Sequence, residues 1–334
     1  MATRTVPLVA LADMLPGQEA DLFALLSSKQ ELLTREGKKY HRVAFRDARR
    51  EVSFPIWTDS VWADDCQRQW TPGLFYKLRA LYRESNYGPQ LEILKIREAT
   101  EADRAEGFDD TMCLPRSRFD PLQMFRELVS LADEWIEDAP LKRLTKNLLE
   151  ANRDALLVLP AATRNHHAFS AGWREHVLSV ARNAAFLADK YDADYPDLRP
   201  RLDRGLVVAG AILHDIGKLR ELEVRPEGAA YSPAGSLIGH SLQGRDMVRE
   251  AAPAADLSGE RLLRLEHIIV SHQRLPEWGA PKPPMTPEAL LVHYADDVDA
   301  KFQMMYAALG EGSTDEPFTS KKNPLMQQIY RGMG

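Results

Sequence analysis

Ala211-Ile212-Leu213-His214-Asp215-Ile216-Gly217-Lys218 places an imidazole and a carboxylate on adjacent residues at the end of an apolar run. The run covers residues 206–213 and predicts a buried helix, and Gly217 then interrupts the pattern. Side chains at a helix end can bind metal without disturbing the helix, so Asp215 could bridge two ions and His214 could hold one. A surface polar pair explains an isolated His-Asp dipeptide equally well, so the other histidines must decide.

The chain has nine histidines, and all except His41 lie between His166 and His293. Neutral imidazole is the commonest metal ligand near physiological pH, and carboxylates favour hard divalent ions. The candidate ligands lie mostly within or at the ends of apolar helical patterns, and in chain order they are His176, His214, Asp215, His240, His272 and Asp296. This order, H…HD…H…H…D, resembles that of the HD-domain metal-dependent phosphohydrolases.

Two histidines near the end of one predicted helix compete for a single place in this set. His267 and His272 are five residues apart, about 140° around a helix, so a regular helix cannot point both the same way. Either the helix ends before His272 or only one of them is a ligand. We favour His272, which comes at the helix end before Pro276, and expect His267 to be buried or to support the ligands. His293 and Asp299 are expected to be structural or supporting groups.

Composition limits the class of protein. A chain of 334 residues allows two or three domains, and its 44% hydrophobic and 28% charged residues are ordinary for a soluble globular protein. No apolar run approaches the roughly 20 residues that cross a bilayer, so no membrane partner is expected. The N-terminus lacks the apolar core of a secretion signal, and Cys66 and Cys113 lie too far apart for a redox or metal motif. These features favour a cytoplasmic protein.

The charge is unevenly distributed. Residues 1–100 hold 15 Lys and Arg against 13 Asp and Glu, a formal +2, which leaves −8 for the remainder of a chain of net charge −6. A basic front and an acidic rear suit a polyanion-binding module followed by a cation-binding one. Ordinary surface variation explains so small a difference equally well.

Residues 18–97 follow a strand pattern. Strands are expected over 21–34, 40–45, 52–57, 74–82 and 90–96, with a short helix over 59–66 and turn signals at Glu36-Gly37-Lys38 and Asn86-Tyr87-Gly88-Pro89. Five strands with a helix after the third is the order of an OB-fold, a small barrel that often binds oligonucleotides.

From Asp120-Pro121 onward the apolar period becomes helical. Helices are expected near 121–136, 140–157, 172–191, 203–214, 239–251, 258–272 and 287–308, with a further one over 324–331. The fold class predicted is therefore a multidomain α+β protein with a small N-terminal OB-fold barrel and an all-α HD domain. The predicted limits are 1–100 for the barrel, 101–119 for a linker, 120–310 for the HD domain and 311–334 for a tail.

Basic and aromatic residues alternate near the second predicted strand. The basic ones are Lys38, Lys39, Arg42, Arg46, Arg49 and Arg50, and Tyr40 and Phe45 lie among them. Stacking of a base on an aromatic ring contributes about 1–3 kcal/mol and tolerates any sequence. Tyr40 and Arg42 are the predicted nucleic-acid contacts, whereas Phe45, Trp57 and Trp62 are more easily explained as barrel core.

Several motifs together extend the resemblance to a narrower family. They are Pro160-Ala161-Ala162-Thr163-Arg164-Asn165-His166-His167-Ala168, Glu175-His176, Leu213-His214-Asp215-Ile216-Gly217-Lys218, Gly239-His240, Val270-Ser271-His272 and His293-Tyr294-Ala295-Asp296. In this order they resemble the YhaM-type 3′–5′ exoribonucleases, in which an OB-fold precedes an HD domain. Two segments depart from the family's pattern: Ala171-Gly172-Trp173-Arg174 replaces a Gly-Gly-Leu stretch, and Ser271-His272-Gln273-Arg274 replaces Ser-His-His-Gly.

The resemblance implies a cytoplasmic hydrolase that removes nucleotides from single-stranded RNA with divalent metal, often manganese. Magnesium, iron, cobalt and nickel are the alternatives. In a two-metal phosphodiesterase site, Asp215 would bridge the ions, His176, His214 and Asp296 would complete one site, and His240 with His272 would hold the other. Lys218 is a candidate for neutralising phosphate charge, with a surface lysine as the equal alternative. Arg164, His166 and His167 are candidates to contact the RNA backbone, and one of the two histidines is expected only to pack.

Two other functions compete with this interpretation. An HD phosphohydrolase acting on a nucleotide or cyclic dinucleotide would use the barrel for regulation. A non-catalytic RNA-binding protein would not need a full set of metal ligands. Single-stranded DNA is the alternative partner to RNA, and the sequence leaves homo-oligomerisation open.

Overall fold

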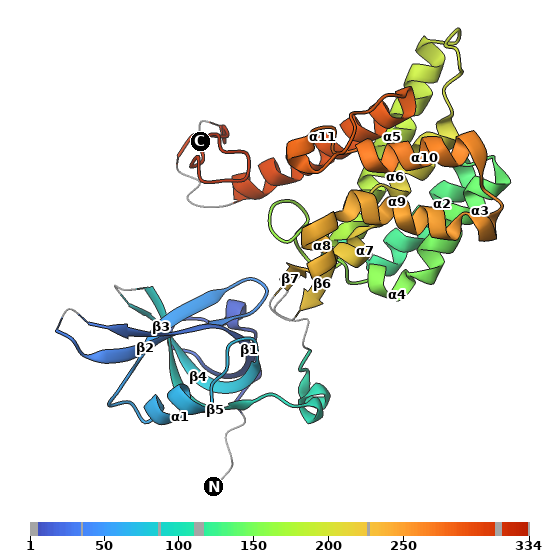
Figure 1. Ribbon diagram of the computed structural model, residues 1–334. Coiled ribbons are helices and arrows are strands. Elements are labelled where there is room, and N and C mark those ends of the chain that lie inside the picture. The colour runs from blue at the N-terminus through green and yellow to red at the C-terminus, as the bar shows by residue number, and fades with distance from the viewer. Residues whose placement is uncertain are drawn as a thin grey trace. The chain divides into compact units, whose positions relative to one another are not determined.

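The chain divides into two compact units in a computed structural model that describes residues 6–34, 36–85, 88–109, 117–225, 228–310 and 316–332. Met1–Pro115 with Arg225–Gly228 form one unit, and Arg116–Val224 with Ala229–Gly334 form the other. The first is built of strands and the second of helices (Figure 1), which confirms the predicted α+β class. No helix within the described ranges is both long and apolar enough to span a membrane. The domain limits predicted from the sequence stay a prediction.

The strand unit is a five-stranded antiparallel sheet that curls into a barrel. Its elements are η1 (Leu11–Asp13), β1 (Glu19–Leu33), β2 (Lys39–Arg46), β3 (Glu51–Trp57), α1 (Ala63–Arg68), β4 (Phe75–Ser85), β5 (Gly88–Glu98) and η2 (Glu101–Glu106). The strands follow the order β3-β2-β1-β4-β5, and the edge strands β3 and β5 pack against each other. With α1 between the third and fourth strands, this is the predicted OB-fold topology.

The long first strand makes closure of the barrel possible. Glu19–Leu25 of β1 pair with β4, and Leu25–Leu33 pair with β2, with a register shift between Leu26 and Ser28. Such an irregularity bends a strand, so one strand can serve two neighbours around a small barrel. Phe45 lies at the centre of the core and packs against Phe54, Trp70 and Tyr76, as predicted.

The predicted linker begins with ordered structure. Thr100 and Asp103 form a capping box around η2, and Gly107 ends it in the left-handed conformation at φ 97°. Asp103 is buried and accepts hydrogen bonds from Arg97 of β5, so η2 is fixed to the barrel. The predicted turn residues Asn86 and Tyr87, the second cysteine Cys113 and residues 110–116 of the predicted linker lie outside the described residues.

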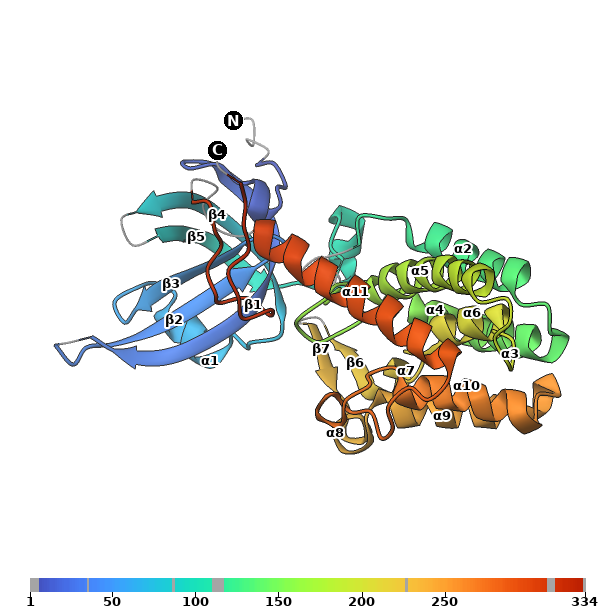
Figure 2. The same cartoon turned by 90° about the horizontal axis from the view of Figure 1, so that it is seen from above.

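The second unit consists of helices around one apolar core. They are α2 (Pro121–Trp135), α3 (Ala139–Ala151), α4 (Arg153–Leu156), α5 (Gly172–Asp194), α6 (Arg204–Leu213), α7 (Lys218–Glu221), α8 (Pro233–Ile238), α9 (His240–Ala251), α10 (Gly259–Ser271) and α11 (Pro287–Gly310), with 3-10 turns η3 (Pro253–Ala255) and η4 (Pro276–Trp278). Helix α6 is buried from Leu206 to Leu213 and packs against α5, α11, α10 and α2. Figure 2 shows α11 running across α5 and α6.

Three features of this unit differ from the prediction. The helix expected over 140–157 is interrupted at Asn152, which separates α3 from α4. Between α7 and α8 the chain forms a hairpin of β6 (Leu222–Arg225) and β7 (Gly228–Tyr231), which no sequence signal had indicated. The helix expected over 324–331 is wrong: this stretch is irregular and its Tyr330 forms an isolated bridge with Phe318. Residues 311–315, 333 and 334 of the predicted tail lie outside the described residues.

Candidate metal centre

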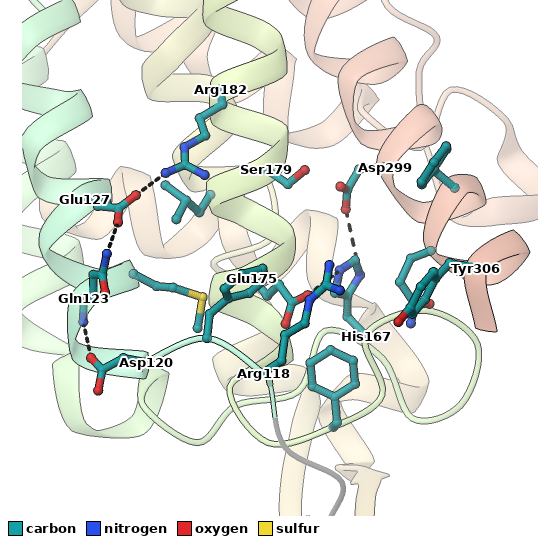
Figure 3. Close-up of a pocket in the computed structure, with 16 residues that line it drawn as sticks. Arg118, Asp120, Gln123, Glu127, His167, Glu175, Ser179, Arg182, Asp299 and Tyr306 are labelled. Atoms are coloured by element: carbon teal, nitrogen blue, oxygen red, sulfur yellow. Dashed lines mark hydrogen bonds and ion pairs between the residues drawn. The ribbon is translucent and has the colours of Figure 1, made fainter. Parts of the chain in front are cut away.

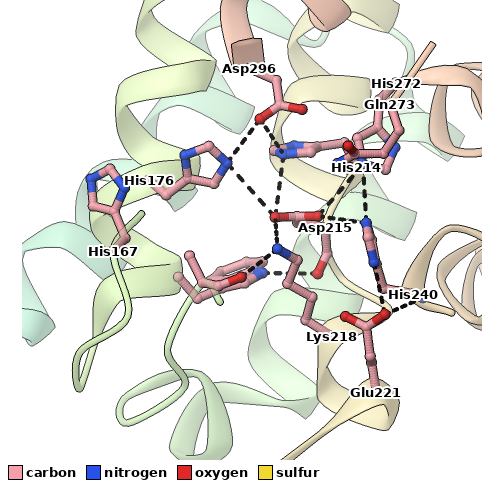
Figure 4. Close-up of polar contacts among 12 residues, drawn as sticks. His167, His176, His214, Asp215, Lys218, Glu221, His240, His272, Gln273 and Asp296 are labelled. Atoms are coloured by element: carbon pink, nitrogen blue, oxygen red, sulfur yellow. Dashed lines mark hydrogen bonds and ion pairs between the residues drawn. The ribbon is translucent and has the colours of Figure 1, made fainter. Parts of the chain in front are cut away.

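The six predicted ligands meet at one place although they come from five segments. His176 lies in the first two turns of α5, His214 and Asp215 follow α6, His240 begins α9, His272 follows α10 and Asp296 lies within α11. Figure 4 shows them converging on Asp215. All are buried except His240, which is partly exposed. Their role as ligands stays a prediction that this geometry supports.

The Asp215 carboxylate divides the cluster into two halves. Its Oδ2 lies 3.7 Å from His176 Nε2 and 3.6 Å from His214 Nε2. Its Oδ1 lies 3.3 Å from His240 Nε2 and 3.6 Å from His272 Nε2. Each half forms a group of three side chains with the spacing of metal ligands, and Asp215 belongs to both. A bridging carboxylate between two ions is the arrangement that this geometry fits.

The other ring nitrogen of each histidine has an acceptor that fixes the tautomer. The acceptors facing Nδ1 are Asp299 at 2.7 Å for His176, the Ala211 carbonyl at 2.7 Å for His214, Glu221 at 3.0 Å for His240 and the Ile269 carbonyl at 2.6 Å for His272. Because each acceptor holds a proton on Nδ1, all four Nε2 atoms are directed to the space around Asp215, and each presents a lone pair there when its ring is neutral.

Lone pairs and carboxylate oxygens in one buried space call for positive charge. His176 Nε2, His214 Nε2 and Asp215 Oδ1 are buried without a hydrogen-bond partner among the described residues. The Nε2 atoms of His240 and His272 are 3.3 Å apart, close to the spacing of two ligands each about 2.1 Å from one ion. Unpaired buried polar atoms are costly, so the donor set fits divalent cations.

The electrostatics of the centre point the same way. Burial disfavours charge on His176, yet the neighbouring carboxylates of Asp296 and Asp299 raise its pKa to about 10, so a metal ion would have to displace the proton from Nε2 of this ring. Burial would raise the pKa of Asp215, but Lys218 and the surrounding histidines hold it well below its ordinary value. The centre therefore keeps its carboxylate ionised and attracts a cation, while burial lowers the pKa of His272 to about 3 and keeps that ring neutral for binding metal.

Lys218 is a member of the buried centre, so the alternative of a surface lysine is wrong. Its side chain is 7% exposed, and Nζ lies 3.0 Å from Asp215 Oδ2 and donates to the Ala161 carbonyl. Burial would lower the pKa of Lys218, but Asp215 raises it. An ammonium group has three protons, so one remains for a substrate.

Gly217 allows α7 and α9 to approach closely. A Cβ on Gly217 would lie 2.0 Å from the His240 carbonyl oxygen and 2.5 Å from the Gly244 nitrogen, both backbone atoms. Only glycine permits this approach, which brings the start of α9 and its His240 to Asp215. In the sequence, Gly217 was interpreted only as the end of an apolar pattern, so this role in packing was missed.

Other supporting contacts were also absent from the prediction. Glu221 binds both the backbone nitrogen of His240 at 2.9 Å and its ring at 3.0 Å. Trp173 Nε1 donates to the Asp215 carbonyl at 2.9 Å. Neither residue has a sequence signal, because both depend on segments that meet only in the folded chain. The expected supporting roles of His293 and Asp299 agree with contacts to the His272 carbonyl and to His176.

The two histidines of α10 take separate roles. His272 follows the last turn and joins the cluster, whereas His267 Nε2 accepts a hydrogen bond from the Met285 backbone at 2.9 Å. His267 is only half-buried and makes no contact with the cluster among the described residues. Gln273, which replaces the family's second histidine, places its side-chain amide 3.1 Å from His272 Nε2.

The predicted RNA contacts before α5 lie at different depths. Arg164 is exposed, His166 is half-buried and His167 is 4% exposed. Both imidazoles lie beside His176, with ring centroids 5.3 Å and 5.4 Å away. Burial lowers the pKa of His166 to about 3 and that of His167 to about 4, so both rings are neutral at physiological pH.

The surface of the barrel carries an aromatic pair, Tyr40 and Trp57, of which only Tyr40 was predicted as a nucleic-acid contact. Tyr40 on β2 pairs with Trp57 on β3, their ring centroids are 5.0 Å apart, and Trp57 is 46% exposed. The interpretation of Trp57 as core is therefore wrong, because its position on the strand faces away from Phe45 and Ile56. Arg42 is two residues from Tyr40 on the same face and is exposed.

The basic cluster around β2 is smaller than predicted. Arg49 pairs with Asp13, and Arg50 donates to the carbonyls of Leu11 and Met14. Lys39 pairs with Glu31 across the neighbouring strand. These side chains hold parts of the barrel together, which leaves Arg42 as the predicted contact beside the aromatic pair.

Comparison with known proteins agrees with the geometry. The family model described as "HD domain" matches residues 173–301. The "3'-5' exoribonuclease YhaM" of Bacillus licheniformis is 33% identical over 301 residues, covering 88% of each chain. The second OB-fold domain of replication protein A from Methanococcus maripaludis matches 28% of this chain and 96% of its own at 13% identity, with a TM-score of 0.22. The assignment of the barrel to the OB-fold rests on the order of its strands and not on this similarity.

An HD domain implies dependence on divalent metal, and its match covers every predicted ligand from His176 to Asp296. The similarity to the curated relative extends over both the barrel and the helical unit, because it includes 88% of the chain. The chain therefore belongs to the YhaM family of 3′–5′ exoribonucleases, with an OB-fold barrel followed by an HD domain.

Proposed function

We propose that this protein is a cytoplasmic exoribonuclease that hydrolyses single-stranded RNA from its 3′ end, using two divalent ions, with manganese favoured. One observation supports the two-metal site above all others. The two oxygens of Asp215 face different pairs of imidazoles, and Asp215 Oδ1 and the Nε2 atoms of His176 and His214 are buried without a hydrogen-bond partner among the described residues. Ions bound there would supply the Lewis acidity that phosphodiester hydrolysis needs.

The protein's own residues prepare the site for a phosphate ester. Asp299 and Glu221 accept the Nδ1 protons of His176 and His240, which holds both imidazoles in the tautomer that binds metal. Lys218 keeps Asp215 ionised and has one ammonium proton left for a phosphate oxygen. This buried positive charge offsets negative charge that develops on the phosphate during hydrolysis.

The barrel would hold the RNA upstream of the cleaved bond. Tyr40 and Trp57 offer aromatic faces on its surface, and Arg42 offers a charge beside them. Stacking accepts any base, which suits an enzyme that degrades many sequences. Single-stranded DNA offers the same bases, so this face by itself would bind both nucleic acids.

The direct test is digestion of a 5′-labelled, single-stranded RNA with a free 3′-hydroxyl. We expect a ladder of shortening products and nucleoside monophosphates, and no digestion of the same RNA in circular form or after chelation of metal. His272→Ala should abolish the ladder, whereas His267→Ala on the same helix should leave it intact, because only His272 lies in the cluster. Cleavage of the circle would indicate an endonuclease.

A different outcome would identify the competing function. If RNA is inert while a nucleotide or cyclic dinucleotide is hydrolysed rapidly with metal, the chain is a small-molecule phosphohydrolase with the same centre. Full activity of the His272→Ala variant or of chelated protein would contradict metal-dependent catalysis altogether.

A further inference from the structure

The helical unit contains a pocket of about 630 Å³, whose lining residues are shown in Figure 3. Its walls come from the start of α2, the loop before α5, the α5 face around Glu175 and the end of α11. This volume falls within the range of sites for small organic ligands. None of the six predicted metal ligands lines it, so it is a separate site.

The pocket is one side chain away from the predicted ligands. Asp299 lines it and accepts the Nδ1 proton of His176, whose Nε2 faces Asp215. His167 also lines it, with its ring centroid 5.4 Å from that of His176. A nucleotide whose phosphate reached the metal centre would therefore have its sugar and base within reach of this pocket.

The pocket contains buried polar atoms that lack partners. His167 is 4% exposed, and its Nδ1 makes no hydrogen bond among the described residues; the Oδ2 atom of Asp299 is 3.8 Å away. Gln303 Oε1 is likewise buried without a partner within the described ranges. The backbone of His167 also has a positive φ of 46°. Its carbonyl oxygen lies so close to Gly172 that a Cβ on Gly172 would be 2.0 Å from it. Such unpaired atoms and strain are typical of binding sites.

Aromatic rings form one side of the pocket. Phe302 and Tyr306 are 71% and 61% exposed, although both are on a helix whose other face is core. The Arg118 guanidinium lies over the rings of Phe119 and Tyr306, at 4.8 Å and 5.5 Å from their centroids. Arg118 forms no ion pair within the described residues. Flat apolar faces with a guanidinium beside them are suited to stacking a nucleobase.

Carboxylates form another part of the pocket. Four acids and two arginines line it, which gives a net charge of −2, and one arginine, Arg182, is already paired with Glu127. Glu175 Oε2 accepts a hydrogen bond from Ser117 at 2.6 Å, and its Oε1 is 4.0 Å from His167 Nε2. A carboxylate accepts two hydrogen bonds from neighbouring hydroxyls, but it repels a phosphate.

We propose that this pocket, which we call the 3′-end pocket, holds the nucleoside at the free 3′ end of RNA, with its base against Phe302 and Tyr306 and its 2′,3′-diol against Glu175. This inference rests on the proposed exoribonuclease function. It explains why cleavage would begin at a chain end, since a pocket with an acidic lining accepts a terminal diol and excludes a 3′-phosphate.

Binding of adenosine to the full-length, metal-free protein tests the pocket without any need for catalysis. Isothermal titration should show adenosine binding at least tenfold more tightly than 2′,3′-dideoxyadenosine or 3′-AMP. Tyr306→Ala should weaken adenosine binding by about tenfold, whereas Phe186→Ala, which removes an exposed aromatic ring of α5 outside the pocket, should not. Equal binding of all three ligands, or an equal effect of both substitutions, would overturn the proposal.

Digestion of RNA with a 3′-hydroxyl or a 3′-phosphate provides the second measurement. The wild-type protein should prefer the hydroxyl end by at least tenfold in kcat/KM. Glu175→Gln removes the charge and keeps the shape, so it should reduce this preference to near unity, while Glu134→Gln on the surface should retain it. An unchanged preference in Glu175→Gln would contradict the role of this carboxylate.

The two measurements separate the pocket from the catalytic function. If the wild-type protein digests no RNA but binds adenosine with the predicted preferences, the exoribonuclease proposal fails and the pocket remains a nucleoside site. If it digests RNA normally and the pocket substitutions change neither adenosine affinity nor end preference, the function stands and the pocket inference is wrong.

Discussion

Two buried aspartates, one in each unit, show how differently the two parts of this molecule use polar groups. Asp103 in the barrel unit is 2% exposed and accepts hydrogen bonds from Arg97 at 2.5 Å and 2.7 Å and from Thr100 at 2.8 Å. Asp215 in the helical unit is 1% exposed, yet its Oδ1 has no hydrogen-bond partner among the described residues. Four imidazoles face its two oxygens, and the close cation Lys218 has its Nζ 3.0 Å from Oδ2.

The difference separates a structural network from a binding site. A satisfied buried carboxylate stabilises the fold that surrounds it, whereas an unsatisfied one costs free energy until a ligand arrives. In the barrel, Asp103 fixes η2 to the end of β5. In the helical unit, the unsatisfied atoms are retained at the junction of five segments, where a cation would pair with all of them.

The largest effect is expected at the metal centre, where two adjacent aspartates provide a matched pair. Asp296 lies 3.1 Å from His176 Nε2, whereas Asp297 pairs with Lys301 on the outer face of α11. Asp296→Asn should reduce kcat/KM on RNA by about 1,000-fold, or about 4 kcal/mol. Asp297→Asn should change it less than twofold. Similar losses in both variants would mean that Asp296 acts only through the stability of the helix.

Substitution of Asp103, whose carboxylate has hydrogen-bond partners, should lower the stability of the barrel and leave the catalytic activity unchanged. Asp103→Ala removes an acceptor from Arg97 and Thr100 and should lower the free energy of unfolding of the barrel by about 3 kcal/mol. Cleavage of a dinucleotide should persist, because the metal centre lies in the other unit. Urea unfolding followed by fluorescence measures the first effect. A drop below 0.5 kcal/mol would show that the network contributes little.

Metal should stabilise the unit that contains the unsatisfied atoms. At a free metal concentration of about 100 times Kd, linkage predicts about 2.7 kcal/mol of added stability. Thermal unfolding with manganese and after chelation should therefore differ for the wild-type protein. In His272→Ala the difference should shrink, whereas His267→Ala should behave as wild type. Equal metal stabilisation of both variants would place the ions elsewhere.

Removal of the exposed aromatic ring should weaken RNA binding without affecting chemistry. Trp57→Ala should cost about 2 kcal/mol of affinity for a single-stranded oligonucleotide, because one base loses its stacking partner. Trp278→Ala is a control that removes a similarly exposed ring of the helical unit. Fluorescence anisotropy with a labelled RNA measures both, and equal affinities for the two variants would remove Trp57 from the binding face.

Low pH should lower the free energy of unfolding of the barrel through protonation of Asp103, by less than the substitutions above. Hydrogen bonds from Arg97 and Thr100 hold the pKa of Asp103 well below its ordinary value of 3.8. The folded state therefore binds fewer protons than the unfolded one as pH falls below 3.8, and stability decreases by up to about 1.4 kcal/mol per pH unit. The contribution is fully present above that pH. In Asp103→Asn this part of the acid dependence should be absent from urea titrations at pH 3 and 4.

The elements that could be predicted were those with a strong local period. The five barrel strands and the helices from α5 to α11 that carry ligands follow from apolar spacing, and the start of α2 follows from Asp120-Pro121, where the Asp120 side chain accepts a hydrogen bond from the Gln123 backbone. The hairpin after α7 and the break at Asn152 have no such local signal. The error over residues 324–331 arose because an apolar period alone does not ensure that a helix has a core to pack against.

The amino-acid sequence by itself determined which side chains could bind metal and placed most of them within or at the ends of predicted helices. The order His176, His214-Asp215, His240, His272 and Asp296 is a property of the chain that needs no structure. Local chemistry decides this, because imidazole and carboxylate are ligands in any fold.

Only the tertiary structure decided which polar groups have hydrogen-bond partners and which side chains are buried. Gly217 brings α9 against α7, Glu221 orients His240, and Trp57 lies outside the barrel core with Tyr40. The pocket beside His167 combines residues from α2, α5 and α11 that are as much as 183 residues apart, from Gln123 to Tyr306. Hydrogen-bond satisfaction depends on atoms within about 3 Å of each other, and such distances between remote segments are fixed by packing and not by sequence position.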